Sequence, residues 1–202
     1  RVFTLKQLVS ASGGNSREAR YIVRDVIEAL IAEGVVDSHG RDKYQLSMAQ
    51  LPHYEGVVDM IGSGAAYVRV EELESDIYVN QRNMNYALEG DRVEVVLQRQ
   101  AHREGDHPEG AVISILERSK KQYVGVAEVS RAAIFVRADS RKLPFDIFFP
   151  RKEYPKVSDG DKVVFNITDW RPGDKSPRGV IVDVLGQAGD NDTEMHAIMA
   201  EF

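Results

Sequence analysis

The stretches EGDRVEV (residues 89–95) and DGDKVVF (residues 159–165) follow the same pattern, although they start 70 residues apart. In each, an acidic turn with a glycine leads into apolar residues at alternating positions, which is typical of a strand with one buried face. The segments around them repeat as well, since Gly56-Val57 matches Gly125-Val126. The chain therefore contains an internal duplication. Because there are only two copies, we expect two sibling domains rather than a solenoid.

Each copy holds five short segments rich in β-branched and aromatic residues, separated by turn-forming residues. Five strands in about 65 residues favour a five-stranded barrel of the OB class, with an SH3-like barrel as the alternative. Residues 93–97 alternate between inward-facing and outward-facing positions, so Glu94 and Val96 are expected on the outer face. The predicted strands of the first copy are 56–60, 66–70, 77–79, 92–97 and 111–116.

The first fifty residues have helical periodicity instead. Thr4 with Gln7, and Asn15 with Glu18, have the spacing of capping boxes, and Gly34 is a natural helix end. Two helices followed by a hairpin predict a partial winged helix-turn-helix, which gives the chain a small α/β module before its mainly β part. A winged helix usually has one more helix in front, so we expect the chain to begin partway into this domain. An apolar stripe marks the second helix: Ala19, Ile22, Val23, Val26, Ile27, Leu30 and Ile31.

Three arginines on the second helix, Arg17, Arg20 and Arg24, could face a phosphate backbone. Four acidic residues dilute this positive charge and favour a solvated helix face.

Composition excludes several classes of protein. The chain has no cysteine, which excludes disulfides and thiolate metal sites, and no apolar run long enough to cross a bilayer. We therefore expect a cytoplasmic protein without a membrane partner. The net charge of −6 is unevenly distributed, with 5 basic and 13 acidic residues in 54–117 but 14 basic and 9 acidic in 118–186. The second copy is thus the better candidate for binding nucleic acid.

Aromatic and basic side chains of the second copy form the candidate site. Single strands bind to aromatic faces beside a basic groove, and each stacked base contributes about 1–3 kcal/mol. The loop 169–178 contains the chain's only tryptophan among three cations, at the place where an OB barrel has a loop that grips oligonucleotides. Packing of these aromatic residues in the barrel core is the alternative. The candidate residues are Phe135, Arg137, Phe148, Trp170, Arg171, Lys175 and Arg178.

The first copy resembles a cold-shock domain. Residues 63–68, SGAAYV, fall where that family has its first RNA-binding motif, and residues 76–80, DIYVN, where it has its second. Three positions depart from the family pattern: Ala65 replaces a stacking aromatic residue, Ser63 a basic residue, and Asn80 a histidine. The resemblance leaves Tyr67 and Tyr78 as RNA-binding candidates in this copy.

The whole order of modules resembles the N-terminal half of the RNase R and RNase II family of 3′-to-5′ exoribonucleases. The segments NYALEGDRV (85–93), EGAVISILER (109–118) and VDVLG (182–186) support this resemblance, and the winged helix favours RNase R. The resemblance implies two cold-shock-like barrels that guide single-stranded RNA towards a magnesium-dependent catalytic domain. That domain would follow this chain, so we expect no catalytic residue, metal site or cofactor here.

The expected domains are a winged helix-turn-helix (1–50), a first barrel (54–117), a second barrel (122–186) and a connector helix (187–202). The winged helix could contact structured RNA or a protein partner, and the oligomeric state is left open. There are two alternatives to the interpretation as part of an exoribonuclease: a stand-alone cold-shock-type RNA chaperone, and a winged-helix nucleic-acid-binding regulator.

Overall fold

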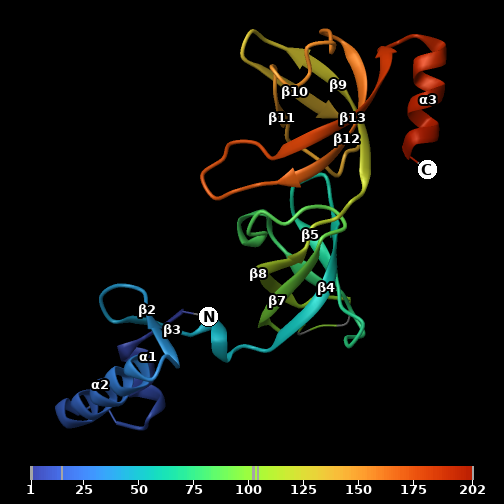
Figure 1. Cartoon of the computed structure of the whole chain (residues 1–202). Coiled ribbons are helices and arrows are strands. Elements are labelled where there is room, and N and C mark those ends of the chain that lie inside the picture. Colours follow the sequence, from blue (N-terminus) through green and yellow to red (C-terminus); the bar gives the residue numbers. More distant parts are fainter. Residues whose placement is uncertain (1, 15, 102, 104, 202) are drawn as a thin grey trace.

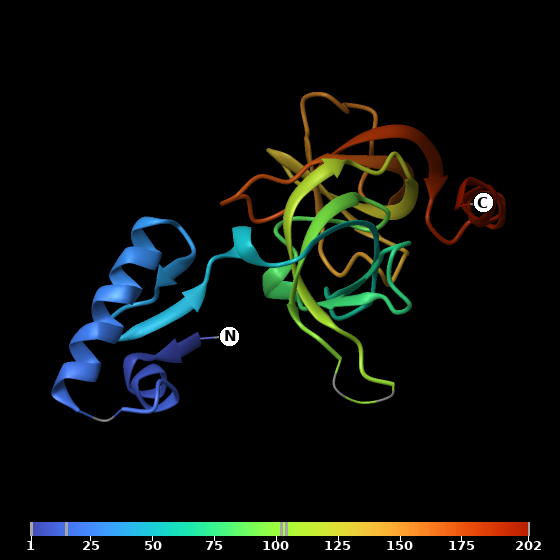
Figure 2. The same cartoon turned by 90° about the horizontal axis from the view of Figure 1, so that it is seen from below.

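The computed structural model describes residues 2–14, 16–101, 103 and 105–201. In this part of the chain, an N-terminal α/β module is followed by two closed five-stranded barrels and a C-terminal helix (Figure 1). The two barrels are stacked directly on each other, whereas the N-terminal module stands apart from them in both views (Figures 1 and 2). None of the described helices has the length and apolar character that a membrane crossing requires.

The N-terminal module has its own small core. Strand β1 (Val2–Thr4) pairs with β3 (Lys43–Leu46), which pairs with β2 (Val36–Ser38), so the hairpin gains a third strand that the sequence did not predict. Helices α1 (Leu5–Ala11) and α2 (Arg17–Ala32) pack beside this sheet. Because its buried residues form a cluster separate from the core of the barrels, the module has its own source of stability.

The helix ends agree in part with the predicted capping. Thr4 and Gln7 form the expected capping box at the start of α1. At the start of α2 the N-cap is Ser16, whose side chain accepts a hydrogen bond from the backbone N–H of Ala19 at 3.1 Å, and the predicted cap Asn15 lies outside the described residues. Gly34 follows the end of α2 in the left-handed conformation, with φ +71°, as a helix stop requires.

The apolar stripe of α2 is wider than the face that the module covers. Ile27 is buried, whereas the side chains of Ile22 and Val26 are 63% and 52% exposed. The apolar stripe of α2 is therefore not buried along its whole width, because the short sheet and α1 cover only one side of it.

A short linker joins this module to the first barrel. The 3-10 helix η1 (Met48–Gln50) leads into the barrel, and His53 connects the two parts. Its Nδ1 lies 2.8 Å from Glu94 Oε1 and its Nε2 lies 3.1 Å from the carbonyl oxygen of Met48. The hydrogen bond to Glu94 raises the pKa of His53 above its ordinary value.

The two barrels have the same topology, which confirms the predicted pair of OB-like barrels. Their strand orders, β4-β5-β6-β8-β7 and β9-β10-β11-β13-β12, are equivalent around the closed sheets. The first barrel consists of β4 (His53–Met60), β5 (Ala66–Arg69), β6 (Ile77–Val79), β7 (Arg92–Arg99) and β8 (Glu109–Glu117), with the 3-10 helix η2 (Gln81–Asn83) after β6. The second consists of β9 (Gln122–Val129), β10 (Ala133–Ala138), β11 (Ile147–Pro150), β12 (Asp161–Asp169) and β13 (Arg178–Gln187), and helix α3 (Asn191–Glu201) follows.

The predicted alternation in β7 is kept. Val93, Val95 and Leu97 belong to the hydrophobic core of the barrels and Val96 does not, although the sequence did not predict that Val96 is fully buried as well. The pairing of β7 with β8 shifts register between Glu94 and Val95, and the extra residue of this bulge, Ile113, lies on β8.

The repeated glycines are required by close contact between strands. A Cβ atom on Gly56 would lie 2.5 Å from the carbonyl oxygen of Arg69, and one on Gly125 would lie 2.5 Å from that of Arg137. These distances are too short for any larger residue, so the glycine repeats because the strand packing repeats.

The repeated aspartate of the two turns anchors the segment that leaves each barrel. Asp91 and Asp161 each accept a hydrogen bond at 2.7 Å from the backbone N–H three residues before them. The other carboxylate oxygen of Asp91 accepts from the N–H of Ser119 at 2.8 Å, and Arg118 pairs with the same side chain. Asp161 binds the side chain of Gln187 instead, at 2.6 Å. Burial raises the pKa of Asp91, an effect that Ser119 and Arg118 oppose.

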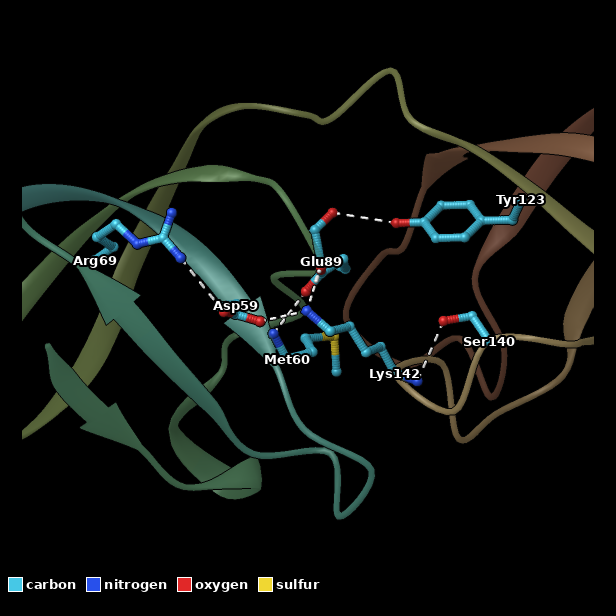
Figure 3. Close-up of polar contacts among 7 residues, drawn as sticks. All are labelled: Asp59, Met60, Arg69, Glu89, Tyr123, Ser140 and Lys142. Carbon is cyan, nitrogen blue, oxygen red and sulfur yellow. Dashed lines mark hydrogen bonds and ion pairs between the residues drawn. The ribbon is translucent and has the colours of Figure 1, made fainter. Parts of the chain in front are cut away.

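A lysine of the second barrel joins the two barrels through acidic side chains of the first (Figure 3). Lys142 Nζ pairs with Asp59 and lies 2.8 Å from Glu89 Oε1. Glu89 is nearly buried, and its other oxygen accepts the backbone N–H of Met60 at 2.6 Å. The hydrogen bonds to Asp59 and Glu89 raise the pKa of Lys142, so it stays charged at neutral pH. We refer to Asp59, Glu89 and Lys142 as the inter-barrel clamp.

Tyr123, at the start of the second barrel, reinforces this clamp. Its hydroxyl donates to the carbonyl oxygen of Glu89 at 3.3 Å (Figure 3). Its ring packs against Phe165 in the core. Burial and the charges of Glu89 and Asp91 raise the pKa of Tyr123. The buried cores of both barrels therefore join into one continuous hydrophobic cluster.

We predict that Asp91→Ala destabilises the protein more than Asp161→Ala does. Both substitutions leave turn N–H groups without an acceptor, but only the first also leaves the largely buried Arg118 without its partner. The loss should be about 3 kcal/mol for Asp91→Ala and roughly 1–2 kcal/mol for Asp161→Ala. Urea unfolding followed by circular dichroism measures both. Equal losses would show that the ion pair with Arg118 contributes nothing.

We further predict that Lys142→Met frees the two barrels from their fixed relative orientation. Glu89 would lose its cationic partner, at a cost between the roughly 1 kcal/mol of an exposed ion pair and the roughly 3 kcal/mol of a buried one. Residual dipolar couplings should fit one alignment tensor for both barrels in the unaltered protein and two in the variant. Lys152→Met, which removes an exposed lysine of the second barrel, is the control. A single tensor in Lys142→Met would contradict this role of the clamp.

Candidate nucleic-acid interface

Four of the predicted residues lie together on the outside of the second barrel. Phe135 and Arg137 are two residues apart on β10, so they share its outer face. Phe148 on β11 is directly opposite Phe135, and Arg178 at the start of β13 is paired with Phe148. Three neighbouring strands thus present two aromatic rings flanked by two arginines. We call these four residues the aromatic face.

The geometry of the aromatic face leaves its rings accessible. The ring centroids of Phe135 and Phe148 are 5.8 Å apart at an interplanar angle of 64°. Phe135 is 37% exposed, and the guanidinium carbon of Arg178 lies 5.8 Å from the centroid of Phe148. An exposed ring with a cation beside it can stack on a base while the cation neutralises a phosphate.

The first barrel has the equivalent pair, with opposite charge beside it. Tyr67 on β5 is opposite Tyr78 on β6, with ring centroids 5.6 Å apart. The position equivalent to Arg178 is Glu109, which pairs with Tyr78 in the parallel ladder and forms an ion pair with Arg99. A carboxylate at this position repels phosphate, so the first barrel is the poorer site for nucleic acid.

His107 also belongs to this surface of the first barrel, although the sequence did not reveal it. Its ring lies 4.8 Å from that of Tyr67, and its Nδ1 lies 3.2 Å from the carbonyl oxygen of Asp76. A histidine in a polar loop gives no sign in the sequence that it folds back onto a strand.

The three departures from the cold-shock pattern have visible structural consequences. Ala65 is buried in the first barrel, with 3% exposure, so it presents no surface for a base. Asn80 caps η2 by accepting the backbone N–H of Asn83 at 3.1 Å. Ser63 remains exposed but carries no charge.

Trp170 lies apart from the aromatic face, at the contact between the barrels. Its ring centroid is 4.7 Å from that of Phe145 and 5.5 Å from that of Tyr86 in the first barrel. Its indole N–H donates to the carbonyl oxygen of Asp174 at 3.2 Å, which fixes the ring within its own loop. All three rings are half-buried and keep part of their surface open to solvent.

The remaining basic residues of this loop are more exposed. Arg171 forms an ion pair with Asp169, and its side chain is 72% exposed. Lys175 is also exposed. Both can reach a phosphate near the loop, but neither is fixed in position by the barrels.

Tyr86 was missed by the sequence reasoning because its role depends on an unusual backbone conformation. Asn85 and Tyr86 have φ angles of +46° and +63°, which are uncommon for residues with a side chain. Three hydrogen bonds stabilise this conformation. Asn85 Nδ2 donates to the carbonyl oxygen of Ile113 at 2.6 Å, and Arg118 donates to the carbonyl oxygen of Tyr86 at 3.2 Å. The backbone N–H of Gly173 donates to the hydroxyl of Tyr86 at 3.4 Å.

Across the described residues, no group of three or more histidine, aspartate or glutamate side chains is arranged to hold a metal ion. The two acidic side chains of the clamp converge on Lys142, and Asp139 and Glu194 converge on Lys162.

Two family models match the barrels. Residues 56–115 match the ribonuclease B OB domain, and residues 135–202 match the cold shock domain. Among solved structures, Mycoplasma genitalium RNase R in complex with ribose methylated single-stranded RNA has a TM-score of 0.62 at 24% identity, covering 73% of this chain and 24% of that one. The yeast pseudonuclease Ssd1 has a TM-score of 0.61 at 19% identity, covering 87% and 26%. These two likenesses concern the fold.

Sequence relatives extend the match over nearly the whole chain. Ribonuclease R of Thermotoga maritima is 27% identical over 198 residues, which is 98% of this chain and 27% of the relative. Ribonuclease R of Escherichia coli is 28% identical over 164 residues, which is 81% of this chain and 20% of the relative. The chain thus spans about a quarter of the length of these curated relatives. Together with the two barrels, these matches support an N-terminal region of the RNase R family.

Proposed function

We propose that this region binds single-stranded RNA for an RNase R-like processive 3′-to-5′ exoribonuclease and guides it towards a magnesium-dependent catalytic domain elsewhere in the protein. The observation that carries the proposal is the aromatic face, where three neighbouring strands of the second barrel present Phe135 and Phe148 beside Arg137 and Arg178. Every base has a face that can stack, so such a surface accepts RNA of any sequence, as a processive enzyme requires.

Electrostatics supports the second barrel as the main contact. The second barrel (122–186) carries 11 basic and 9 acidic residues, whereas the first (54–117) carries 5 basic and 13 acidic residues. Attraction of phosphates to arginines makes binding weaken steeply with salt. In this proposal Tyr67 and Tyr78 contribute less, because Glu109 takes the place that Arg178 has in the second barrel.

The relatives support RNA as the partner and leave the chemistry to another part of the protein. The RNase R of Mycoplasma genitalium has been solved with single-stranded RNA, whereas Ssd1, with the same fold in this region, is described as a pseudonuclease. Barrels of this fold thus occur both in a ribonuclease and in a pseudonuclease. RNA binding is therefore the function that we assign to this chain.

The same proposal covers the other modules. We divide the chain into a winged helix-turn-helix (1–50), two barrels (54–117 and 122–186) and a connector (187–202), and assign the contact with structured RNA to the first. The exposed arginines Arg17 and Arg20 on α2 are available for such a contact. The cytoplasm is the compartment that we propose for the whole protein.

We predict that Phe135→Ala weakens binding of an unstructured RNA oligonucleotide by about tenfold, since one stacked base contributes about 1–3 kcal/mol. The equivalent substitution in the first barrel, Tyr67→Ala, should change affinity much less. Arg178→Ala should lower the slope of log K against log salt by about one. Fluorescence anisotropy with a labelled oligonucleotide at several salt concentrations measures all three.

Circular dichroism and thermal melting provide the folding control for these variants. An equal loss in Phe135→Ala and Tyr67→Ala would contradict the assignment to the second barrel. Absence of binding by the unaltered protein even at low salt would refute the proposed function itself.

A further inference from the structure

A groove of about 480 Å³ runs along the junction between the barrels, away from the strands of the aromatic face. Its lining includes Met48 of the linker, the η2 region of the first barrel, and Phe145 and Trp170 of the second. The volume is that of a typical small-ligand site, and such sites are common where domains meet.

One end of the groove is aromatic. Tyr86, Phe145 and Trp170 lie there with ring centroids 4.7 and 5.5 Å apart, and all three are half-buried. Met60 and Met84 form apolar walls beside them. Apolar and aromatic walls of this kind accept a flat ring by stacking.

The neighbouring part of the groove is polar but carries no negative charge. Three amide side chains line it, those of Gln81, Asn83 and Asn85, and in the described part of the chain Arg82 is its only lining residue charged at neutral pH. Gln81 and Arg82 are exposed. Amides can donate to and accept from the edge of a base, and a guanidinium can pair with a phosphate.

We propose that this groove is a second RNA site, which holds one nucleobase of the single strand and distinguishes between bases through Gln81. The inference rests on the proposed function, because it needs RNA to be the ligand. The aromatic face binds any base by stacking alone, whereas the groove adds hydrogen-bonding groups that read the edge of the base. The nucleotide's phosphate lies against Arg82.

The fixed backbone around Tyr86 supports this assignment. Asn85 and Tyr86 keep their uncommon φ angles because Ile113, Arg118 and Gly173 hold them through hydrogen bonds. The contact from Gly173 also ties the loop of Trp170 to the first barrel. Both sides of the aromatic end are thus held in place before a ligand arrives, which reduces the entropy lost on binding.

An acidic peptide does not fit the groove as well as RNA does. The aromatic rings and the amides of the groove suit a base, and its one cation, with no carboxylate among the described residues of the lining, suits a phosphate. Many grooves that bind an extended peptide offer the exposed edge of a sheet, with which the peptide backbone pairs. The lining of this groove consists of side-chain amides and aromatic rings instead. RNA is therefore the occupant to which we commit.

The fluorescence of Trp170 tests the inference directly, because it is the chain's only tryptophan. Oligonucleotides of adenine, uracil or cytosine are titrated into the protein while anisotropy of a label reports total binding. We expect saturable quenching of Trp170 by at least one oligonucleotide, and we expect it to persist at saturation in Phe135→Ala. Gln81→Ala should narrow the affinity ratio between adenine and uracil oligonucleotides by about fivefold. Arg82→Ala should weaken all of them and lower the salt slope by about one.

Lys6→Ala, which removes an exposed cation of α1, is the matched control for charge. RNA that binds by anisotropy without quenching Trp170, and with the same affinities in Gln81→Ala and Arg82→Ala, would refute the groove site and leave the proposed function intact. Loss of all RNA binding in the unaltered protein would refute both. Quenching by a tyrosine-containing peptide but not by RNA would also refute the inference.

Discussion

The relative position of the two barrels depends on the pairing of Lys142 with Glu89 and Asp59. This clamp joins residues 53 and 83 positions apart in the chain and holds the second barrel against the first. Glu89 belongs to the same turn as Asp91, which anchors the linker between the barrels through Ser119 and Arg118. One turn of the first barrel therefore holds both the linker that follows this barrel and the second barrel itself. If the second barrel were not held in this position, the groove at the junction would lose the side that Phe145 and Trp170 form.

Duplication followed by divergence explains how two barrels with one topology came to differ in surface chemistry. The buried glycines, the turn aspartates and the strand order are shared because closure of the barrel requires them. The aromatic pairs are shared as well, but Glu109 stands where the second barrel has Arg178. This exchange of charge at the start of the last strand adds to the overall difference in charge between the acidic first barrel and the second. The acidic first barrel instead supplies the carboxylates of the clamp and one side of the groove.

The repeat, the strands and the capping of α1 could be predicted because each depends on residues close together in the sequence. The aromatic face could also be predicted, since matching positions in two copies revealed which rings share a side of the sheet. Predictions failed where a distant contact decides the outcome. Val96 is buried although it lies outside the hydrophobic core of the barrels, and Ile22 is exposed because no described element covers it. Tyr86 contacts Trp170, which lies 84 positions further along the chain, because of a backbone conformation that no local sequence pattern predicts.

In the proposed arrangement, single-stranded RNA lies on the second barrel and continues into the junction between the barrels. Photocrosslinking of oligonucleotides that carry 5-iodouridine at single positions, with mass-spectrometric mapping of the attached peptides, tests this most directly. We expect crosslinks to the strands of Phe135 and Phe148 and, from a different position of the same RNA, to Tyr86 or Trp170 at the junction. Crosslinks confined to Tyr67 and Tyr78 of the first barrel, or to the N-terminal module, would contradict it.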